Sequence, residues 1–202
     1  ADFSTTYDAR SPIRVASFTI NDFHAQRRIL TLPEVFTHSS NIGTAKMALA
    51  AGIERHKEFM HRMGFFERPH TELPESAEPL TPARWSDLAS MTISFGHGFS
   101  VAPIQAAAGG AALMNGGLLI PPTFLPRTQE QARALARQVV QPSTSDMMRE
   151  LFRMNVEEGT ARKAAAKGFR VGGKTGTAEK VVNGRYSNSK LLNTFLAGFP
   201  MD

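Results

Sequence analysis

The sequence predicts an α/β fold in which a helical part is followed by strands of an antiparallel sheet. Helix caps and apolar residues at three- and four-residue spacing recur over about residues 20–160, and extended segments around an Asn-Gly pair follow over about residues 169–200. The chain has 202 residues, of which 42% are hydrophobic. That composition can bury one sizeable core, so residues 1–202 are expected to belong to a single domain.

Two expected helices flank a polar turn near residue 40. Thr31 to Glu34 has the pattern of a capping box and predicts a short helix through Phe36. A second helix is expected to end at Gly52, with one face formed by Ile42, Ala45, Lys46 and Leu49. The turn between them carries Ser39 and Asn41, whose hydroxyl and carboxamide can both project into a cleft. Both residue types are also common helix caps, so a purely structural role is the alternative.

The middle of the chain reads as helices separated by glycine and proline. Four prolines between Phe66 and Arg84 predict a surface connection with little regular structure. A glycine-bearing turn is expected over Ile93 to Val101, after which Pro103 opens an alanine-rich helix that ends at Gly116-Gly117. Ser143 to Asp146 is expected to cap another helix, whose apolar face carries Met147, Met148, Leu151 and Phe152.

A strand with distinctive chemistry is expected from Val171 to Ala178. Side chains alternate in an extended segment, so Thr175 and Thr177 share one face. Lys174 and Gly176 share the other, where the glycine leaves the backbone open to a substrate and the lysine supplies a positive field. On its own, this short string is equally typical of a hairpin strand with a solvated lysine.

Four segments occur in an informative order: His38–Gly43, Ile93–Gly98, Glu158–Ala161 and Gly173–Ala178. This order resembles the class B penicillin-binding proteins, over the C-terminal part of their transpeptidase domain. Two features resemble the division-type (septal) peptidoglycan D,D-transpeptidases within this class. One is Asn41, a position at which elongation-type relatives usually carry Asp, and the other is the Glu-Gly-Thr-Ala segment. The resemblance implies a partial penicillin-recognising fold of the serine β-lactamase/transpeptidase type, with a helical subdomain and part of an antiparallel sheet.

The resemblance also implies a reaction and roles for individual residues. The reaction is acyl transfer on the D-Ala-D-Ala end of a peptidoglycan stem peptide during septal cell-wall synthesis, and β-lactam antibiotics bind as mimics of that end. Ser39 would relay a proton to the leaving amine, Asn41 would bond the substrate amide, and Lys174 would tune the proton network. The threonine hydroxyls would hold a carboxylate, and the Thr177 N–H would form half of an oxyanion hole. The expected substrate-binding residues are Ser40, Thr175, Gly176 and Thr177. No cofactor is implied.

The nucleophile of this family is a serine in a Ser-x-x-Lys string that precedes the Ser-x-Asn motif, here Ser39 to Asn41, and no such string precedes Ser39 in this sequence. Ser4, Ser11 and Ser17 are followed three residues later by Tyr7, Arg14 and Ile20. Ser187 to Lys190 matches the pattern, but it follows Asn183-Gly184, which predicts a type I′ hairpin turn. It also precedes the apolar strand Phe195 to Phe199, so a helix start is not expected there. The catalytic serine is therefore expected in a preceding segment, and the chain alone is expected to be inactive.

Composition excludes several other functions. The chain has no cysteine, so neither a disulfide framework nor a thiolate nucleophile is expected. The net charge is +5, but the basic residues between Arg149 and Arg170 alternate with acidic ones and lack an aromatic stacking series, which argues against nucleic-acid binding. The spacing of His56 and His61 is not that of metal ligands, so no metal is expected.

The resemblance further implies a location and partners for the longer parent protein. An N-terminal anchor would hold it in the inner membrane with this part facing the periplasm, and divisome proteins are candidate partners. The chain itself has no run of about 18 apolar residues and is expected to be soluble. Two other functions remain open: a serine β-lactamase or D-Ala-D-Ala carboxypeptidase, and a β-lactam sensor domain without catalysis.

Overall fold

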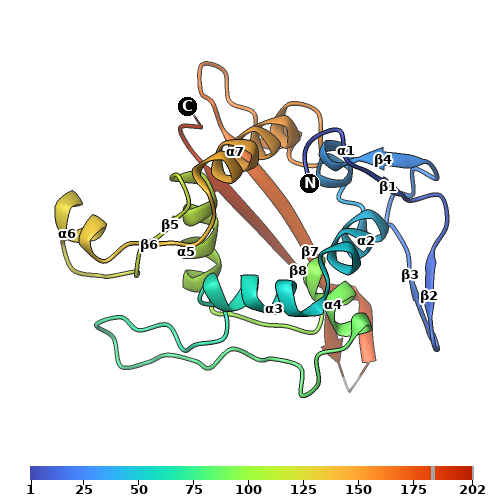
Figure 1. Ribbon diagram of the computed structural model, residues 1–202, viewed down its shortest axis with the longest axis horizontal. Helices are drawn as coiled ribbons and strands as arrows, with labels where there is room; N and C mark the ends of the chain where they lie inside the picture. The colour runs from blue at the N-terminus through green and yellow to red at the C-terminus, as the bar shows by residue number, and fades with distance from the viewer. Residues whose placement is uncertain (183–184, 202) are drawn as a thin grey trace.

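A computed structural model describes residues 1–182 and 185–201 (Figure 1). Its helices are α1 Leu32–Thr37, α2 Asn41–Ala51, α3 Ile53–Arg62, α4 Asp87–Ser94, α5 Pro103–Met114, α6 Gln129–Ala134 and α7 Pro142–Glu157, with a 3₁₀ turn at Arg162–Ala164. Its strands are β1 Thr6–Asp8, β2 Ile13–Val15, β3 Phe18–Ile20, β4 Ile29–Thr31, β5 Leu118–Leu119, β6 Arg137–Gln138, β7 Gly172–Val182 and β8 Arg185–Gly198. The expected combination of helices and antiparallel strands is confirmed.

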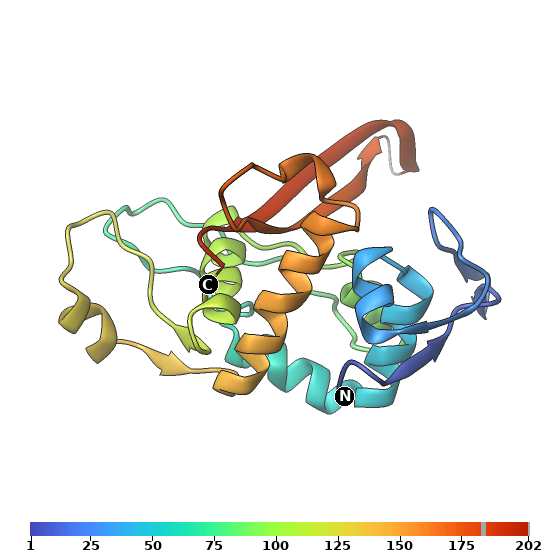
Figure 2. The ribbon, with the colours of Figure 1, turned by 90° about the horizontal axis from the view of Figure 1, so that it is seen from above.

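The long β7–β8 hairpin and helix α7 form the centre of the molecule. Figure 2 shows α7 lying beneath the hairpin, with α5 on one side and α1 and α2 on the other. The short pairs β1–β4 and β2–β3 lie beyond α2, and α6 projects from the opposite end (Figure 1). The four short strands near the N-terminus and the β5–β6 pair were not predicted, because strands of two or three residues are too short to show a periodic pattern.

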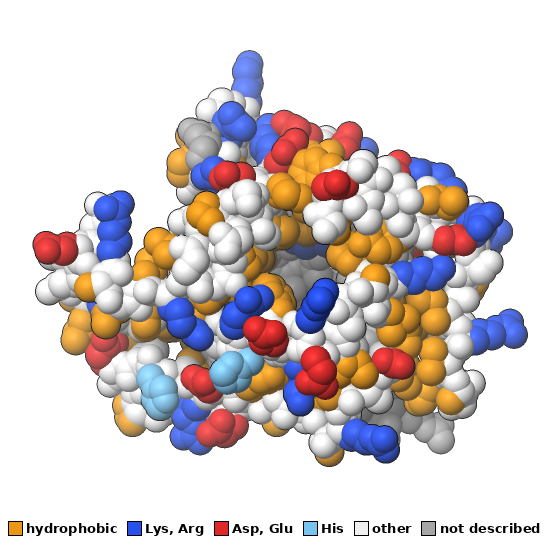
Figure 3. All heavy atoms as spheres, viewed as in Figure 1, with side chains coloured by type: hydrophobic (Ala, Val, Ile, Leu, Met, Phe, Trp, Pro, Cys, Tyr) orange, Lys and Arg blue, Asp and Glu red, His pale blue; other side chains and the backbone are white. Residues whose placement is uncertain are grey.

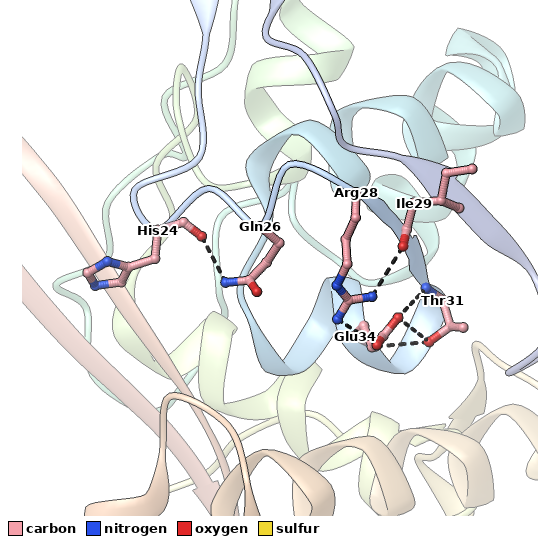
Figure 4. A network of polar contacts seen from close by, with 6 residues as sticks. All are labelled: His24, Gln26, Arg28, Ile29, Thr31 and Glu34. Atoms are coloured by element: carbon pink, nitrogen blue, oxygen red, sulfur yellow. Dashed lines mark hydrogen bonds and ion pairs between the residues drawn. The ribbon is translucent and has the colours of Figure 1, made fainter.

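The predicted capping box at the start of α1 is confirmed. The Thr31 N–H donates to Glu34 Oε2 at 2.9 Å, and the Glu34 N–H donates to Thr31 Oγ1 at 3.4 Å. Arg28 Nη2 donates to Glu34 Oε1 at 2.7 Å, as Figure 4 shows. The bonds that its carboxylate accepts, first from Arg28 and then from the Thr31 N–H, lower the pKa of Glu34 to about 2. The entry into α1 is therefore fixed by local interactions that the sequence specifies.

Helix α2 buries a slightly different face from the one predicted. Ile42 and Ala45 are buried as expected, but Leu49 is 41% exposed and Ala48 is buried in its place. Ile42 packs with Leu30 and Val35 on one side, whereas Ala45 packs with Met91 of α4. The helix ends at Gly52, whose φ of 85° suits glycine.

One predicted helix start and one predicted turn start were misplaced. Helix α7 begins at Pro142 with Gln141 as its N-cap, so Ser143 lies inside the first turn and does not cap it. Proline has a fixed φ and needs no N–H at the first helical position, which moves the start upstream of Ser143. The turn expected from Ile93 begins later, because α4 runs to Ser94.

A buried asparagine ties α7 to β7. Asn155 is fully buried, and its Nδ2 donates to the Gly173 carbonyl at 2.7 Å. Its Oδ1 accepts bonds from the Thr160 N–H at 3.0 Å and the Thr160 hydroxyl at 3.2 Å. Close packing supports the link, since a Cβ on Gly172 would lie 3.1 Å from Phe152 Cβ. One carboxamide therefore positions both the strand and the turn after α7.

The predicted hairpin is also confirmed. Gly173 pairs with Ala197 and Thr177 with Asn193, but the register shifts between Glu179 and Lys180. The Asn183-Gly184 turn itself lies outside the described residues. Four large apolar side chains of this region are more than 40% exposed: Leu191, Leu192, Phe195 and Phe199. Among the helices that the structure describes, each falls short of the length and apolar character needed to cross a membrane.

Replacing Asn155 with alanine should destabilise the protein. The variant leaves the Gly173 carbonyl without its buried donor and leaves the Thr160 N–H with only the Thr37 carbonyl, at a cost of about 2–4 kcal/mol. Chemical denaturation of the full-length protein measures the loss. Asn193→Ala, on the exposed part of β8, is the matched control and should change the free energy of unfolding by less than about 0.5 kcal/mol. Equal effects of the two variants would contradict the assigned role of Asn155.

Candidate active site

Ser39 adopts a backbone conformation that normally selects glycine. It follows the last residues of α1 with φ at 54°, in the left-handed region. Its N–H donates to the Phe36 carbonyl at 3.2 Å, and the next N–H, of Ser40, donates to the Val35 carbonyl at 3.0 Å. This pair of bonds is a Schellman motif with Ser39 at the left-handed position. The strained backbone places the Ser39 hydroxyl at the end of α1, on the side of strand β7.

Ser40 and Asn41 are fixed from the other side by the segment after β3. Ser40 Oγ accepts the Gly43 N–H at 3.0 Å as the N-cap of α2 and donates to Asp22 Oδ2 at 2.8 Å. The other carboxylate oxygen of Asp22 accepts the Ile42 N–H at 2.9 Å. Asn41 Nδ2 donates to the Asn21 carbonyl at 3.0 Å, which orients the carboxamide. Ser40 is only 2% exposed, so its hydroxyl acts as a helix cap in this conformation.

Lys174 on β7 meets Ser39 although 135 residues separate them. Lys174 Nζ lies 2.8 Å from Ser39 Oγ and 3.1 Å from the Thr175 carbonyl. The ammonium also lies 5.7 Å from the centroid of the Phe36 ring. Burial lowers the pKa of Lys174 to about 8, because the charged form loses solvation. The lysine therefore stays mainly protonated at neutral pH but titrates close to it.

The rest of the Lys-Thr-Gly-Thr segment follows along β7. Thr175 Oγ1 donates to Thr160 Oγ1 at 2.9 Å, and the Thr177 side chain is exposed. Gly176 pairs with Thr194, and a Cβ built on this glycine would lie 2.5 Å from Thr194 Oγ1. Part of the requirement for glycine therefore comes from the partner strand, in addition to the open backbone that the sequence predicted.

The Ser-x-x-Lys match at Ser187 lies on a strand. Ser187 and Lys190 both belong to β8, and Ser187 Oγ lies 3.3 Å from Ser189 Oγ. The register of the hairpin shifts here, because Glu179 pairs with Leu191 and Lys180 pairs with Ser187, so the match lies on an irregular part of a strand. The prediction that no helix starts at Ser187 is confirmed.

Charged side chains are distributed over the part of the chain that the structure describes. No cluster of three or more His, Cys, Asp or Glu side chains there could hold a metal ion. Acidic and basic side chains are interspersed over the face seen in Figure 3. Two of the basic residues on α7 form ion pairs of 2.8 Å, Arg149 with Asp146 and Arg153 with Glu157.

Sequence reasoning missed two residues that shape this site. Asn155 carried a signal, because it is a polar residue at core spacing from Leu151 and Phe152 on α7. Asp22 had no such signal in the sequence, since it lies on an irregular segment and contacts α2 only in the folded chain. The first supports β7 and the second supports the loop before α2.

Comparison with known proteins identifies related sequences and folds. The sequence model described as penicillin binding protein transpeptidase domain matches residues 3–201. The probable peptidoglycan D,D-transpeptidase FtsI of Caulobacter vibrioides is 40% identical over 207 residues, covering 100% of this chain and 35% of the relative. The probable peptidoglycan D,D-transpeptidase PenA of Neisseria meningitidis is 34% identical over 194 residues, covering 94% of this chain and 32% of the relative. The chain thus spans about a third of the length of these relatives.

A solved structure gives the same fold. The apo transpeptidase domain of penicillin-binding protein 3 from Burkholderia pseudomallei superposes with a TM-score of 0.90 at 28% identity. The match covers 98% of this chain and 61% of that one. The sequence and structural comparisons therefore agree over nearly the whole chain.

The strain at Ser39 can be measured by two substitutions. Glycine adopts the left-handed conformation without a Cβ clash, so Ser39→Gly should be more stable than Ser39→Ala by about 1 kcal/mol. Chemical denaturation of both variants in the full-length protein measures the difference. An alanine variant as stable as the glycine variant would show that Ser39 is not strained.

The lowered pKa of Lys174 predicts a pH-dependent stability. Between a folded-state pKa of about 8 and the model value of 10.5, the unfolded chain binds more protons, so the contribution of Lys174 to stability rises with pH. Below pH 8 its buried charge destabilises the fold. Lys174→Met should therefore be more stable than the wild type at pH 6, and this advantage should shrink between pH 8 and pH 10.

Denaturation of the full-length protein at several pH values checks this expectation. Lys180→Met removes an exposed lysine from the same strand and controls for the loss of a surface charge. A constant difference between the Lys174→Met variant and the wild type from pH 6 to 10 would contradict the lowered pKa.

Proposed function

This chain belongs to the penicillin-binding protein transpeptidase domain family, class B, and on that premise we propose that it forms the C-terminal part of a division-type peptidoglycan D,D-transpeptidase. The substrate is the D-Ala-D-Ala end of a stem peptide, and β-lactams bind in its place. The observation that carries the proposal is the 2.8 Å contact between Lys174 Nζ and Ser39 Oγ, which joins two family motifs.

Each group at the site has a role in this proposal. Lys174 supplies positive charge and, with Ser39, a path for a proton to the leaving amine. Asn41 has its Oδ1 left for a substrate N–H, since its Nδ2 is engaged by Asn21. Thr175 and Thr177 bind the substrate carboxylate, and the Thr177 N–H donates to the oxyanion. Gly176 keeps the strand open to the substrate backbone. Ser40 supports the site indirectly, because its hydroxyl caps the start of α2.

The nucleophile is proposed to lie in a preceding part of a longer protein. The Ser-x-x-Lys match within this sequence is on strand β8, away from a helix start. By analogy with the relatives, the longer protein is anchored in the inner membrane, faces the periplasm and works with divisome proteins. The roles of this chain are then orientation and electrostatics, and covalent catalysis needs the missing serine.

Intact-mass spectrometry with benzylpenicillin tests the proposal. The full-length protein should form one covalent adduct that maps outside residues 1–202, whereas the isolated chain should form none. An adduct on Ser187 would overturn the assignment of the nucleophile. Rapid hydrolysis of the antibiotic would instead indicate a β-lactamase or carboxypeptidase, and binding without any adduct would indicate a sensor domain.

A further inference from the structure

A chain of hydrogen bonds runs from the core to the carboxylate-binding strand. It begins at the buried Asn155, passes through the Thr160 hydroxyl and ends at the Thr175 hydroxyl, with oxygen–oxygen distances of 3.2 and 2.9 Å. Thr160 lies on the turn after α7, and its side chain is exposed. Thr160 has no role in the proposed function.

Asn155 determines the direction of every hydrogen in this chain. Its two neighbours are a carbonyl at Gly173, which only accepts, and the N–H of Thr160, which only donates. The carboxamide can therefore be placed in one orientation, with Oδ1 toward Thr160. In this ligand-free arrangement the Thr160 hydroxyl donates to that oxygen and accepts from Thr175. Without a ligand, the Thr175 hydroxyl thus donates its single hydrogen to Thr160, and the lone pairs of its oxygen face outward.

The turn that carries Thr160 is held rigidly. The Thr160 N–H donates to Asn155 Oδ1 and also to the Thr37 carbonyl at 3.2 Å. The neighbouring N–H groups of Gly159 and Ala161 donate to the Asn155 carbonyl at 3.1 and 3.2 Å. A Cβ on Gly159 would lie 2.1 Å from Asn155 Oδ1, so the turn packs directly on the asparagine. The Thr160 hydroxyl is therefore preorganised beside Thr175.

We propose that Thr160 is a positioning residue that makes Thr175 a donor when a carboxylate binds, an inference that rests on the proposed function. The Thr175 hydroxyl turns toward the anion, and the Thr160 hydroxyl turns from Asn155 to Thr175. Both hydrogens stay on their own oxygens, and each rotates about its own C–O bond. The bond given up, from Thr160 Oγ1 to Asn155 Oδ1, is the longest of the chain at 3.2 Å, and Oδ1 keeps the Thr160 N–H.

Reversing the direction of these hydrogen bonds strengthens ligand binding. A hydroxyl that accepts one hydrogen bond becomes a better donor of another, and the acceptor here carries a negative charge. Removing the Thr160 hydroxyl should therefore weaken the first, non-covalent complex with a penicillin. The later acylation step should change little, because Thr160 does not contact the reacting carbonyl in this proposal.

A double-mutant cycle in the full-length protein tests this role. The measured quantities are the dissociation constant of the initial benzylpenicillin complex and the acylation rate constant. Thr160→Val should raise the dissociation constant about three- to tenfold and leave the acylation rate constant within about twofold. Thr160→Ser keeps the hydroxyl and should bind like the wild type. In a Thr175→Val background, Thr160→Val should have no further effect on binding.

A matched control separates this role from a loss of stability. Thr128→Val removes the hydroxyl that caps the outlying helix α6, and it should leave both constants unchanged. Additive effects of the Thr160 and Thr175 substitutions, or unchanged or tighter binding by Thr160→Val, would overturn the positioning role. A wild-type protein that forms no penicillin adduct would overturn the proposed function itself, and the role of Thr160 with it.

Discussion

The structure depends on one buried carboxamide that joins helix α7 to strand β7. Asn155 is fully buried, its Nδ2 donates to the Gly173 carbonyl, and its Oδ1 accepts from the N–H and the hydroxyl of Thr160. A buried polar group is stable only when its partners are in place, so this side chain enforces one register of strand, turn and helix. The positions of Lys174, Thr175 and Thr160 follow from that register.

A second constraint, the backbone conformation of Ser39, fixes how the loop before α2 contacts β7. Ser39 occupies the left-handed position of a Schellman motif, which costs energy for any residue other than glycine. The bonds from Ser39 and Ser40 back to α1 hold it from one side, and the Asp22 carboxylate holds the start of α2 from the other. Strain that is fixed from both sides persists, and here it places Ser39 Oγ 2.8 Å from Lys174 Nζ.

The chemistry of the proposed site follows from these two constraints. A lysine whose pKa is lowered by burial lies between a serine hydroxyl and a strand carbonyl, where it can orient a proton and attract an anion. Preorganised donors of this kind act without reorganising during a reaction. A chain that provides orientation and charge in this way complements a nucleophile supplied by another segment.

Local features were predicted well from the sequence. The capping box of α1, the end of α2 at Gly52 and the β7–β8 hairpin depend on residues close together in the chain, and the structure contains all three. The motifs around Ser39 and Lys174 were also recognisable, because their residue types and order are distinctive. The start of α7 was misplaced by one to two residues, since proline and serine are both common at helix starts.

By itself, the sequence determined helices α1, α2, α5 and α7, the hairpin and the residue types of the site. Only the tertiary structure decided that Ser39 meets Lys174, that Asp22 holds Ser40 and that Asn155 directs the hydroxyls of Thr160 and Thr175. These contacts join residues that are distant in the chain or lie on irregular segments, where no periodicity marks a partner. Their geometry depends on how α1, α2 and α7 pack around β7, and packing is a property of the whole fold.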